Sequence, residues 1–248
     1  MRALIYDDLV RFYPLLDPLE DHADEAEAYG GVLLGEVPGA QSLLELGAGA
    51  GHGAHYIKRH FTSVTLTDLS SPMLGRSRTL NPDCEHRVGD MRTLRLGRTF
   101  DCVLCHDAVA YMLSESDLRS VLETAWAHLR PGGAALFVPD ALAETFVETH
   151  EDHAGDDGDR SLRAISWSYD PDPSDTTHVY DFAFLLREGG EVRAVHDRHV
   201  CGLFPEATWV RLAESVGFEV ATAQRPLPAE YADSGYTDTM FVLRRRGG

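Results

Sequence analysis

A strand-like apolar run that ends in a cluster of glycines constrains this chain more than any other feature. The run at 43–46 leads into glycines at 47, 49, 51 and 53, and a second apolar run ends on Asp68. A strand that feeds a glycine turn into a helix, with an acid closing the next strand, is how α/β folds hold an adenine ribonucleoside. Glycine lets the backbone approach a ligand closely, and the carboxylate of Asp68 can accept hydrogen bonds from both ribose hydroxyls. The sequence therefore predicts a nucleoside site in an α/β fold.

Strand-like and helix-like segments alternate around this motif. We expect strands at 42–46, 63–68, 84–89, 100–106, 134–139, 218–223 and 239–244. We expect helices at 23–34, 52–60, 114–129 and 207–216, and another that opens at Ser70. The alternation predicts a doubly wound, mostly parallel sheet of seven strands with helices on both faces.

The stretch from 141 to 204 interrupts this order. Runs at 164–169, 178–186 and 192–204 alternate between apolar and polar residues, and 188–190 is typical of a hairpin turn. Residues 152–160 are polar and contain glycine, so we expect a mobile loop there. We predict that 1–140 and 205–248 form the core, and that 141–204 form an inserted antiparallel sheet covering the substrate cleft.

Four groups with ligand-binding chemistry fall where the first four strands end: Gly47, Asp68, Asp90 and His106. In an open parallel sheet, ligands bind outside the carboxyl ends of the strands. We therefore expect these four residues to share one site.

Four motifs in this order resemble the class I S-adenosylmethionine-dependent methyltransferases: Glu45–Gly51, Asp68, Gly89–Met91 and Leu129–Gly133. They cover roughly 40–140, and the final strand pair fits the reversed seventh strand of that Rossmann-like methyltransferase fold. Residues 11–13 and the inserted sheet look like the small-molecule N-methyltransferases that dimethylate aminosugars in macrolide biosynthesis.

A nicotinamide-dependent dehydrogenase is the rival interpretation of the glycine loop, because Gly49, Gly51 and Ala54 also fit G-x-G-x-x-A. Three features favour the methyltransferase: Glu45 just before the loop, Asp90 after strand three, and the Arg-Pro-Gly-Gly turn before strand five. A third hypothesis is an S-adenosylmethionine-binding protein with a regulatory role or other chemistry.

The resemblance implies that S-adenosyl-L-methionine is held by the glycine loop, the strand-end acids and their neighbours. These residues are Tyr13, Glu45, Gly47, Ala48, Gly49, Gly51, Asp68, Leu69, Met73, Gly89, Asp90, Met91, His106 and Asp107. Met73 belongs either beside the adenine or in the core. Asp90 either flanks the adenine or caps the turn that follows it.

Three side chains are candidates for the chemistry. Tyr13 matches the tyrosine that closes over cofactor and substrate in the aminosugar enzymes. His106 is either a general base or a hydrogen-bond partner of the methionine part of the cofactor, and we favour the second. Alternation puts Asp197 and His199 on one face of the inserted sheet, which either covers the active site or faces solvent. His199 is the second candidate base.

Methyl transfer from a sulfonium is an in-line displacement, in which the protein mainly positions the nucleophile. We therefore predict an S-adenosylmethionine-dependent methyltransferase that modifies nitrogen or oxygen of a small molecule. The net charge of −18 argues against a nucleic-acid substrate, since phosphate binding needs a basic surface.

Three further features of the sequence concern the location of the protein, its cysteines and metal binding. No apolar run reaches the roughly 18 residues of a membrane span, and the first ten residues lack a secretory signal, so we expect a cytoplasmic enzyme. A homodimer is a separate expectation, with a small molecule as the substrate. Cys102 and Cys105 form a CxxC within an expected strand, where an offset of three puts them on opposite faces. We expect neither a shared disulfide nor a metal, because no histidine pair with a carboxylate has a spacing that compels one.

Overall fold

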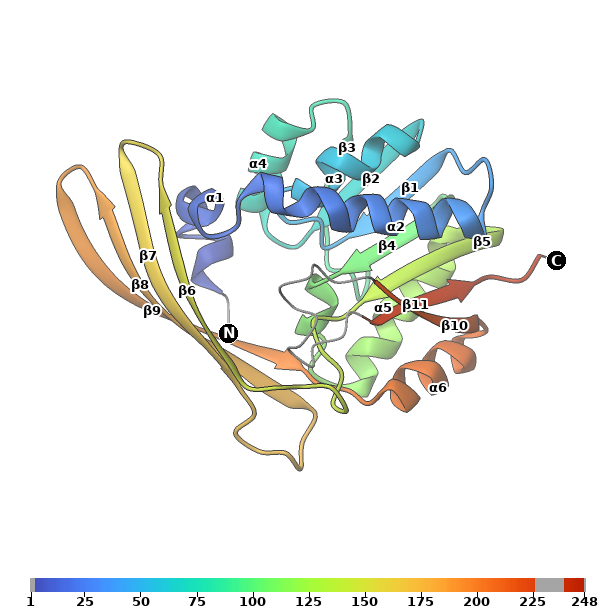
Figure 1. The fold of residues 1–248 in the computed structure, drawn as a ribbon. Helices are drawn as coiled ribbons and strands as arrows, with labels where there is room; N and C mark the ends of the chain where they lie inside the picture. The colour runs from blue at the N-terminus through green and yellow to red at the C-terminus, as the bar shows by residue number, and fades with distance from the viewer. Residues whose placement is uncertain (1–2, 226–238, 248) are drawn as a thin grey trace.

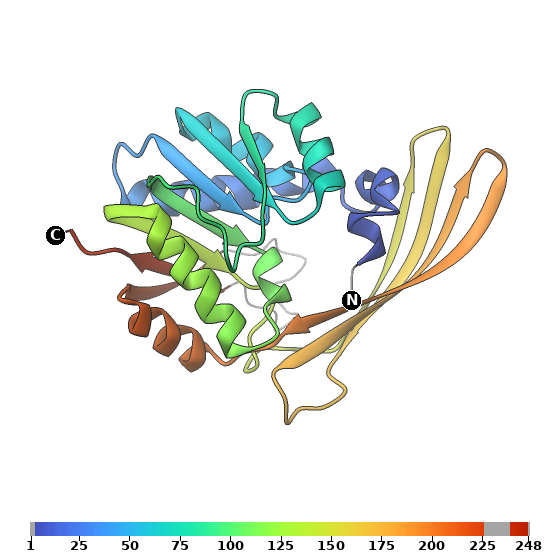
Figure 2. The same ribbon diagram turned by 180° about the vertical axis from the view of Figure 1, so that it is seen from behind.

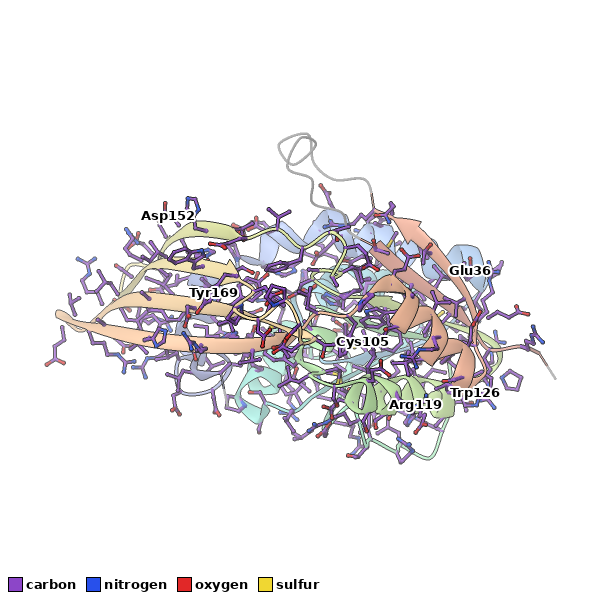
Figure 3. The ribbon with its side chains drawn as sticks, turned by 90° about the horizontal axis from the view of Figure 1, so that it is seen from below. Glu36, Cys105, Arg119, Trp126, Asp152 and Tyr169 are labelled. Atoms are coloured by element: carbon purple, nitrogen blue, oxygen red, sulfur yellow. The ribbon has the colours of Figure 1, made fainter. Side chains whose placement is uncertain are left out.

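The computed structural model describes residues 3–225 and 239–247, which form two sheets with an N-terminal segment packed between them (Figure 1). A seven-stranded sheet flanked by helices makes up one side, and a four-stranded antiparallel sheet makes up the other. Viewed from below, Asp152 and Tyr169 lie on the four-stranded sheet, Glu36 and Trp126 lie at the other end of the molecule, and Cys105 lies between them (Figure 3).

The core sheet has the strand order β10-β11-β5-β4-β1-β2-β3. Its strands are β1 (Ser42–Leu46), β2 (Ser63–Asp68), β3 (Glu85–Val88), β4 (Phe100–His106), β5 (Leu129–Val138), β10 (Glu219–Gln224) and β11 (Thr239–Arg244). β1 pairs in parallel with β2 and β4, whereas β11 runs antiparallel to both of its neighbours. The predicted doubly wound sheet with a reversed last strand is confirmed.

Two groups of helices cover the two faces of this sheet (Figure 2). They are α2 (Ala23–Glu36), α3 (His52–Ile57), α4 (Ser71–Leu80), α5 (Glu115–His128) and α6 (Glu206–Val216). α5 and α6 bury Leu118 and Trp209 in the same apolar cluster as Cys105, and α2 buries Leu33 in a cluster with Cys102. The two cysteines are free thiols on opposite faces, as predicted.

Residues 130–133 differ from the expectation of a turn before strand five. β5 already begins at Leu129, and its register with β4 jumps from Phe100–Leu129 to Cys102–Ala134. Extra residues on one strand of a pair bulge outward and bend the strand. The Arg-Pro-Gly-Gly motif is therefore a bulge within β5, immediately after α5 ends.

The inserted sheet contains β6 (Thr149–Asp156), β7 (Arg160–Tyr169), β8 (Thr177–Glu188) and β9 (Glu191–Gly202), paired in that order. The hairpin at Gly189 and Gly190 is confirmed, with positive φ at both glycines. The loop expected over 152–160 is wrong for its first half, which is edge strand β6. β6 is mostly exposed on both faces, so it has no apolar alternation to reveal a strand.

The N-terminal segment packs onto the inserted sheet. Its short helices are η1 (Leu4–Tyr6), η2 (Val10–Phe12), α1 (Tyr13–Leu16) and η3 (Leu19–His22). Ile5 and Phe12 are buried in one cluster with Leu162 and Phe184 of the sheet. A Cβ at Gly155 would lie 2.3 Å from the Leu15 carbonyl oxygen, so β6 approaches α1 at backbone distance. This contact fixes the start of the chain between the two sheets.

Candidate functional site

The carboxyl ends of β1, β2, β3 and β4 lie along one edge of the core sheet, because these strands are parallel neighbours. Backbone hydrogen bonds tie the ends together, from Gly47 N–H to the Thr67 carbonyl (2.8 Å) and from Gly89 N–H to the Asp68 carbonyl (3.0 Å). The structure therefore brings the predicted strand-end residues to one place.

The glycine loop requires glycine for two physical reasons. Gly47 has φ +77°, and a Cβ there would lie 2.3 Å from the Ala108 Cβ. Gly51 has φ +75°, and a Cβ there would lie 2.3 Å from the Ser77 hydroxyl oxygen. L-residues with side chains rarely adopt this backbone region. At Gly47 and Gly51 the loop therefore packs against Ala108 and Ser77 through its backbone, with no room for a side chain.

Asp68 faces the loop. Its Oδ2 accepts a hydrogen bond from Gly49 N–H (2.8 Å), and its Oδ1 accepts one from Ser70 N–H (2.7 Å). Burial raises the pKa of Asp68, although these backbone donors act against the rise. Each carboxylate oxygen has a second lone pair, so both can still accept from a ligand hydroxyl.

The residues expected beside a nucleobase divide into exposed and buried ones. Leu69 is 68% exposed just after β2, so its apolar side chain is open to a ligand at the end of that strand. Met73 is buried with its methyl group 3.4 Å from the position of a Cβ on Gly49, so it lies in the core directly under the loop. Asp90 binds the guanidinium and the N–H of Arg92 and holds the turn after β3.

Glu45 and Asp107 hold His106 between them. His106 Nε2 lies 3.2 Å from Glu45 Oε1, and its Nδ1 lies 3.1 Å from Asp107 Oδ2. Burial lowers the pKa of His106, but the two carboxylates outweigh it and raise the pKa well above its ordinary value. Asp107 has φ +49°, a strained conformation for this residue type that turns its carboxylate back toward the imidazole.

This arrangement makes His106 a cation with both ring nitrogens donating. A protonated imidazole has no lone pair left to take a proton. Glu45 is 1% exposed, and its Oε2 is buried without a hydrogen-bond partner among the residues that the structure describes. Glu45 Oε2 is therefore a carboxyl oxygen that can accept a further hydrogen bond.

Tyr13, the first residue of α1 in the N-terminal segment, lies against α3, the helix that follows the glycine loop. Its hydroxyl donates to Asp17 Oδ2 at 2.5 Å, and its ring centroid is 5.5 Å from that of His52. Burial and the neighbouring Asp17 carboxylate raise the pKa of Tyr13, so the phenol stays neutral. Tyr13 thus joins the start of the chain to the first residue of α3.

Asp17, His22 and His52 form a cluster that the sequence spacing did not reveal. One ligand-type atom from each lies within 4.8 Å of the others. His22 Nε2 lies 3.0 Å from Asp17 Oδ1, and its Nδ1 lies 2.7 Å from Glu25 Oε1. Burial lowers the pKa of His22, yet the two carboxylates raise it to about 10. The carboxylates therefore balance the charge of His22 within the cluster, and we assign the cluster to docking of the N-terminal segment.

On β9, Asp197 and His199 occupy the buried face of the inserted sheet, so these two side chains do not face solvent. That this face covers the active site stays a prediction. His199 Nδ1 lies 2.8 Å from the Tyr111 hydroxyl, and its Nε2 lies 3.2 Å from Asp197 Oδ2. Tyr111 belongs to η5 (Ala108–Tyr111), the turn that follows β4. Sequence reasoning missed Tyr111, because nothing in the local pattern connects it to residues 88 positions away.

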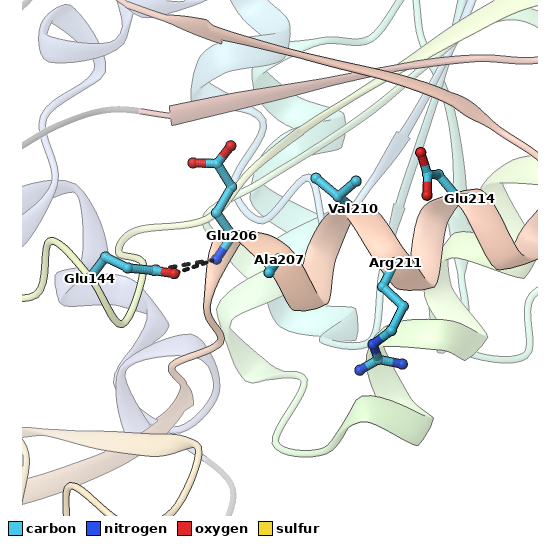
Figure 4. Close-up of a pocket in the computed structure, with 6 residues that line it drawn as sticks. All are labelled: Glu144, Glu206, Ala207, Val210, Arg211 and Glu214. Atoms are coloured by element: carbon cyan, nitrogen blue, oxygen red, sulfur yellow. Dashed lines mark hydrogen bonds between the residues drawn. The ribbon is translucent and has the colours of Figure 1, made fainter.

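A surface pocket lies elsewhere, along α6 (Figure 4). Glu144, Glu206, Ala207, Val210, Arg211 and Glu214 line it. The Glu144 carboxylate accepts the Glu206 N–H and caps the helix. None of the predicted site residues lines this pocket, so we do not assign it to the site. Within 3–225 and 239–247, no helix is long and apolar enough to cross a bilayer.

The chain is similar in sequence to known methyltransferases. Residues 43–133 match the family described as "Methyltransferase domain". A dTDP-3-amino-3,4,6-trideoxy-alpha-D-glucopyranose N,N-dimethyltransferase from Streptomyces venezuelae is 29% identical over 87% of each chain. A malonyl-[acyl-carrier protein] O-methyltransferase from Salmonella typhimurium is 30% identical but covers 48% of this chain and 47% of its own.

Solved structures share the whole architecture. DesVI from Streptomyces venezuelae superposes with a TM-score of 0.80 and 25% identity, covering 97% of this chain and 98% of its own. The sugar N-methyltransferase KedS8 from Streptoalloteichus superposes with a TM-score of 0.84 and 23% identity, covering 99% and 94%. The inserted sheet is therefore part of the shared fold.

Proposed function

Because this chain is a class I S-adenosylmethionine-dependent methyltransferase that acts on a small molecule, we propose that its acceptor is the amino nitrogen of a sugar. The observation that carries the proposal is how far the likeness extends. The aminosugar enzyme from Streptomyces venezuelae matches over 220 residues, which must include much of the inserted sheet. The O-methyltransferase matches over 121 residues, about half of the chain. The match that extends beyond the core is the one to the N,N-dimethyltransferase, which favours nitrogen as the acceptor atom.

The residues at the strand ends fit the cofactor. Within 3–225 and 239–247, Glu45 Oε2 has no hydrogen-bond partner, so this carboxyl oxygen can accept from the ammonium of the methionine part. The bare backbone at Gly47 allows close approach, and the free lone pairs of Asp68 suit the ribose hydroxyls. Leu69 offers an exposed apolar surface to the adenine. When bound, the sulfonium supplies a methyl group already activated for transfer.

An amine acceptor suits the side chains that meet between the two sheets. Tyr6, Tyr13 and Tyr111 are neutral phenols whose pKa values are raised, chiefly by burial. Aromatic rings attract an ammonium group by about 0.5–2 kcal/mol per contact. An amine must only lose one proton before it attacks, so positioning does most of the remaining work, up to roughly 7–11 kcal/mol.

We also propose a cytoplasmic enzyme with no nucleic-acid partner, in line with four free cysteines and the net charge of −18. A homodimer stays a prediction. The sugar names of the relatives make a sugar nucleotide the first acceptor to test.

The test is to incubate the purified enzyme with S-adenosylmethionine and a panel of dTDP-linked aminosugars and their hydroxyl analogues. S-adenosylhomocysteine release and a mass gain of one or two methyl groups on nitrogen are the expected result. Transfer to a hydroxyl analogue, with the amines left unmodified, would overturn the nitrogen proposal.

A pair of glycine variants tests the cofactor assignment. Gly47→Ala places a Cβ against Ala108 and should weaken S-adenosylmethionine binding at least tenfold, about 1.4 kcal/mol, in calorimetry. Gly31→Ala on α2 meets nothing within 4 Å and serves as the matched control. Equal affinity in both variants would place the cofactor away from the loop.

A further inference from the structure

We propose that Asp197, His199 and Tyr111 form a proton relay that removes the proton from the acceptor amine, with Tyr111 as the catalytic residue that touches the acceptor. The proposal rests on the proposed nitrogen acceptor. It assigns the base to residues that join the inserted sheet to the core, and it takes that role away from His106.

The contacts form one continuous chain. The Tyr111 hydroxyl lies 2.8 Å from His199 Nδ1, and His199 Nε2 lies 3.2 Å from Asp197 Oδ2. The same Asp197 oxygen accepts the N–H of Ile5 at 3.0 Å. Asp197 and His199 are 4% and 5% exposed, so water does not compete for these groups.

Charge fixes the direction of the relay. Burial raises the pKa of Asp197, but the His199 hydrogen bond and the N–H groups of Leu4 and Ile5 outweigh it and lower the pKa. An ionised Asp197 can only accept, so His199 carries its proton on Nε2 and leaves the Nδ1 lone pair to the Tyr111 hydroxyl. This is the order of a carboxylate–imidazole–hydroxyl triad, with a phenol in the outer position.

Three parts of the chain converge on the outer end of the relay. Tyr111 is the last residue of η5, the short helix that follows β4, and β4 itself ends at His106. The Tyr6 hydroxyl from η1 lies 3.2 Å from the Tyr111 hydroxyl. The Tyr6 ring centroid lies 5.6 Å from that of His199 and 5.9 Å from that of Tyr13. The relay therefore ends among the rings that we assign to the acceptor amine.

The surroundings of Tyr111 explain why its hydroxyl needs His199 to accept a proton. Burial raises the pKa of Tyr111, and the nearby Tyr6, Cys201 and Asp140 groups add to the rise. Such a phenol does not persist as a phenolate, so it can pass a proton onward only to a base. His199 is that base, and Asp197 is a positioning residue that stabilises the imidazolium.

The proton balance is complete within these residues. The ammonium of the acceptor gives a proton to the Tyr111 oxygen while the Tyr111 hydroxyl proton moves to His199 Nδ1. The freed lone pair on nitrogen forms the new N–C bond as the methyl–sulfur bond breaks, and that electron pair stays on sulfur. The imidazolium of His199 later returns its proton to water through Tyr111.

The experiment measures kcat, KM and cofactor affinity for Tyr111→Phe, His199→Gln and Asp197→Asn between pH 6.5 and 9, with an aminosugar acceptor. A relay predicts that kcat of Tyr111→Phe and His199→Gln falls about 10²-fold at pH 7, within the range for general base catalysis. The deficit should shrink as the pH approaches the pKa of the amine, because the amine then arrives without its proton. Cofactor affinity should stay within twofold. Asp197→Asn should show a smaller loss of kcat with the same pH dependence.

His196→Gln is the matched control, since His196 lies on the exposed face of the same strand and pairs with Asp181. A kcat deficit that is equal at every pH in Tyr111→Phe would reduce the network to a structural role and overturn the relay. Tyr111→Phe keeps the packed ring, so the pH dependence of its kcat can be measured even if Asp197→Asn folds poorly. If the wild-type enzyme methylates only hydroxyl acceptors, the proposed function fails instead, and product analysis distinguishes the two failures.

Discussion

His106 and His199 show how two regions of one molecule use the same residue type in opposite ways. His106, at the carboxyl end of β4 in the core, lies between the carboxylates of Glu45 and Asp107. His22, in the N-terminal segment, likewise lies between Asp17 and Glu25. His199 lies between one carboxylate and a phenol. A histidine between two acids is a fixed cation, whereas one between an acid and a hydroxyl keeps a lone pair for proton transfer.

The largest effect is expected from removing the buried acid of the first region. Glu45→Ala leaves the His106 cation without its buried partner, and breaking such a pair should lower the free energy of unfolding by about 3 kcal/mol. It also removes the acceptor oxygen proposed for the cofactor ammonium. Urea unfolding and calorimetric titration with S-adenosylmethionine measure both losses. Asp107→Asn, at a side chain 59% exposed, should cost less. Equal costs would mean that burial does not distinguish the two partners.

The second prediction concerns the pH dependence of the His22 ion pairs. The folded pKa of about 10 exceeds the ordinary value of 6.5, so the stabilisation is complete below pH 6.5 and is lost as the pH rises through 10. His22→Gln should lower the free energy of unfolding by about 2 kcal/mol at pH 6, and by much less at pH 10. Unfolding at pH 6, 8 and 10 measures this, with His150→Gln on exposed β6 as the control. A loss that stays constant from pH 6 to 10 would show that His22 is not a fixed cation.

The third prediction separates an anchoring histidine from a transferring one. His106→Gln removes the charge between Glu45 and Asp107 and should lower stability by about 1.5 kcal/mol. The pH profile of kcat should keep the wild-type shape, because His106 has no lone pair to use. Steady-state rates from pH 6.5 to 9 check this against His199→Gln. If the pH dependence of kcat disappears in His106→Gln, His106 rather than His199 is the base.

The two regions also differ in how much the sequence reveals of them. Gly47, Asp68 and His106 lie at the carboxyl ends of parallel strands, and the rule that such strand ends meet is enough to bring them together. The relay depends on where β9 docks, because 88 residues separate Tyr111 from His199 and 192 separate Ile5 from Asp197. No local pattern carries such information. Alternation limited Asp197 and His199 to one face, and only packing shows that it is the buried one.

The smallest effect is expected at Tyr13, which lies between the two regions. Tyr13→Phe removes the hydroxyl that donates to Asp17 but keeps the ring beside His52 and Tyr6. One lost hydrogen bond should cost about 1 kcal/mol of stability and less than tenfold in methyl transfer. Because Asp17 has no route to His199 through this hydroxyl, the pH profile of kcat should not change. Tyr13→Leu, which also removes the ring, is the comparison for packing. Tyr13→Phe could instead show the same pH-dependent loss of kcat as Tyr111→Phe. The acceptor proton would then leave toward Asp17, and His199 would not be the residue that receives it.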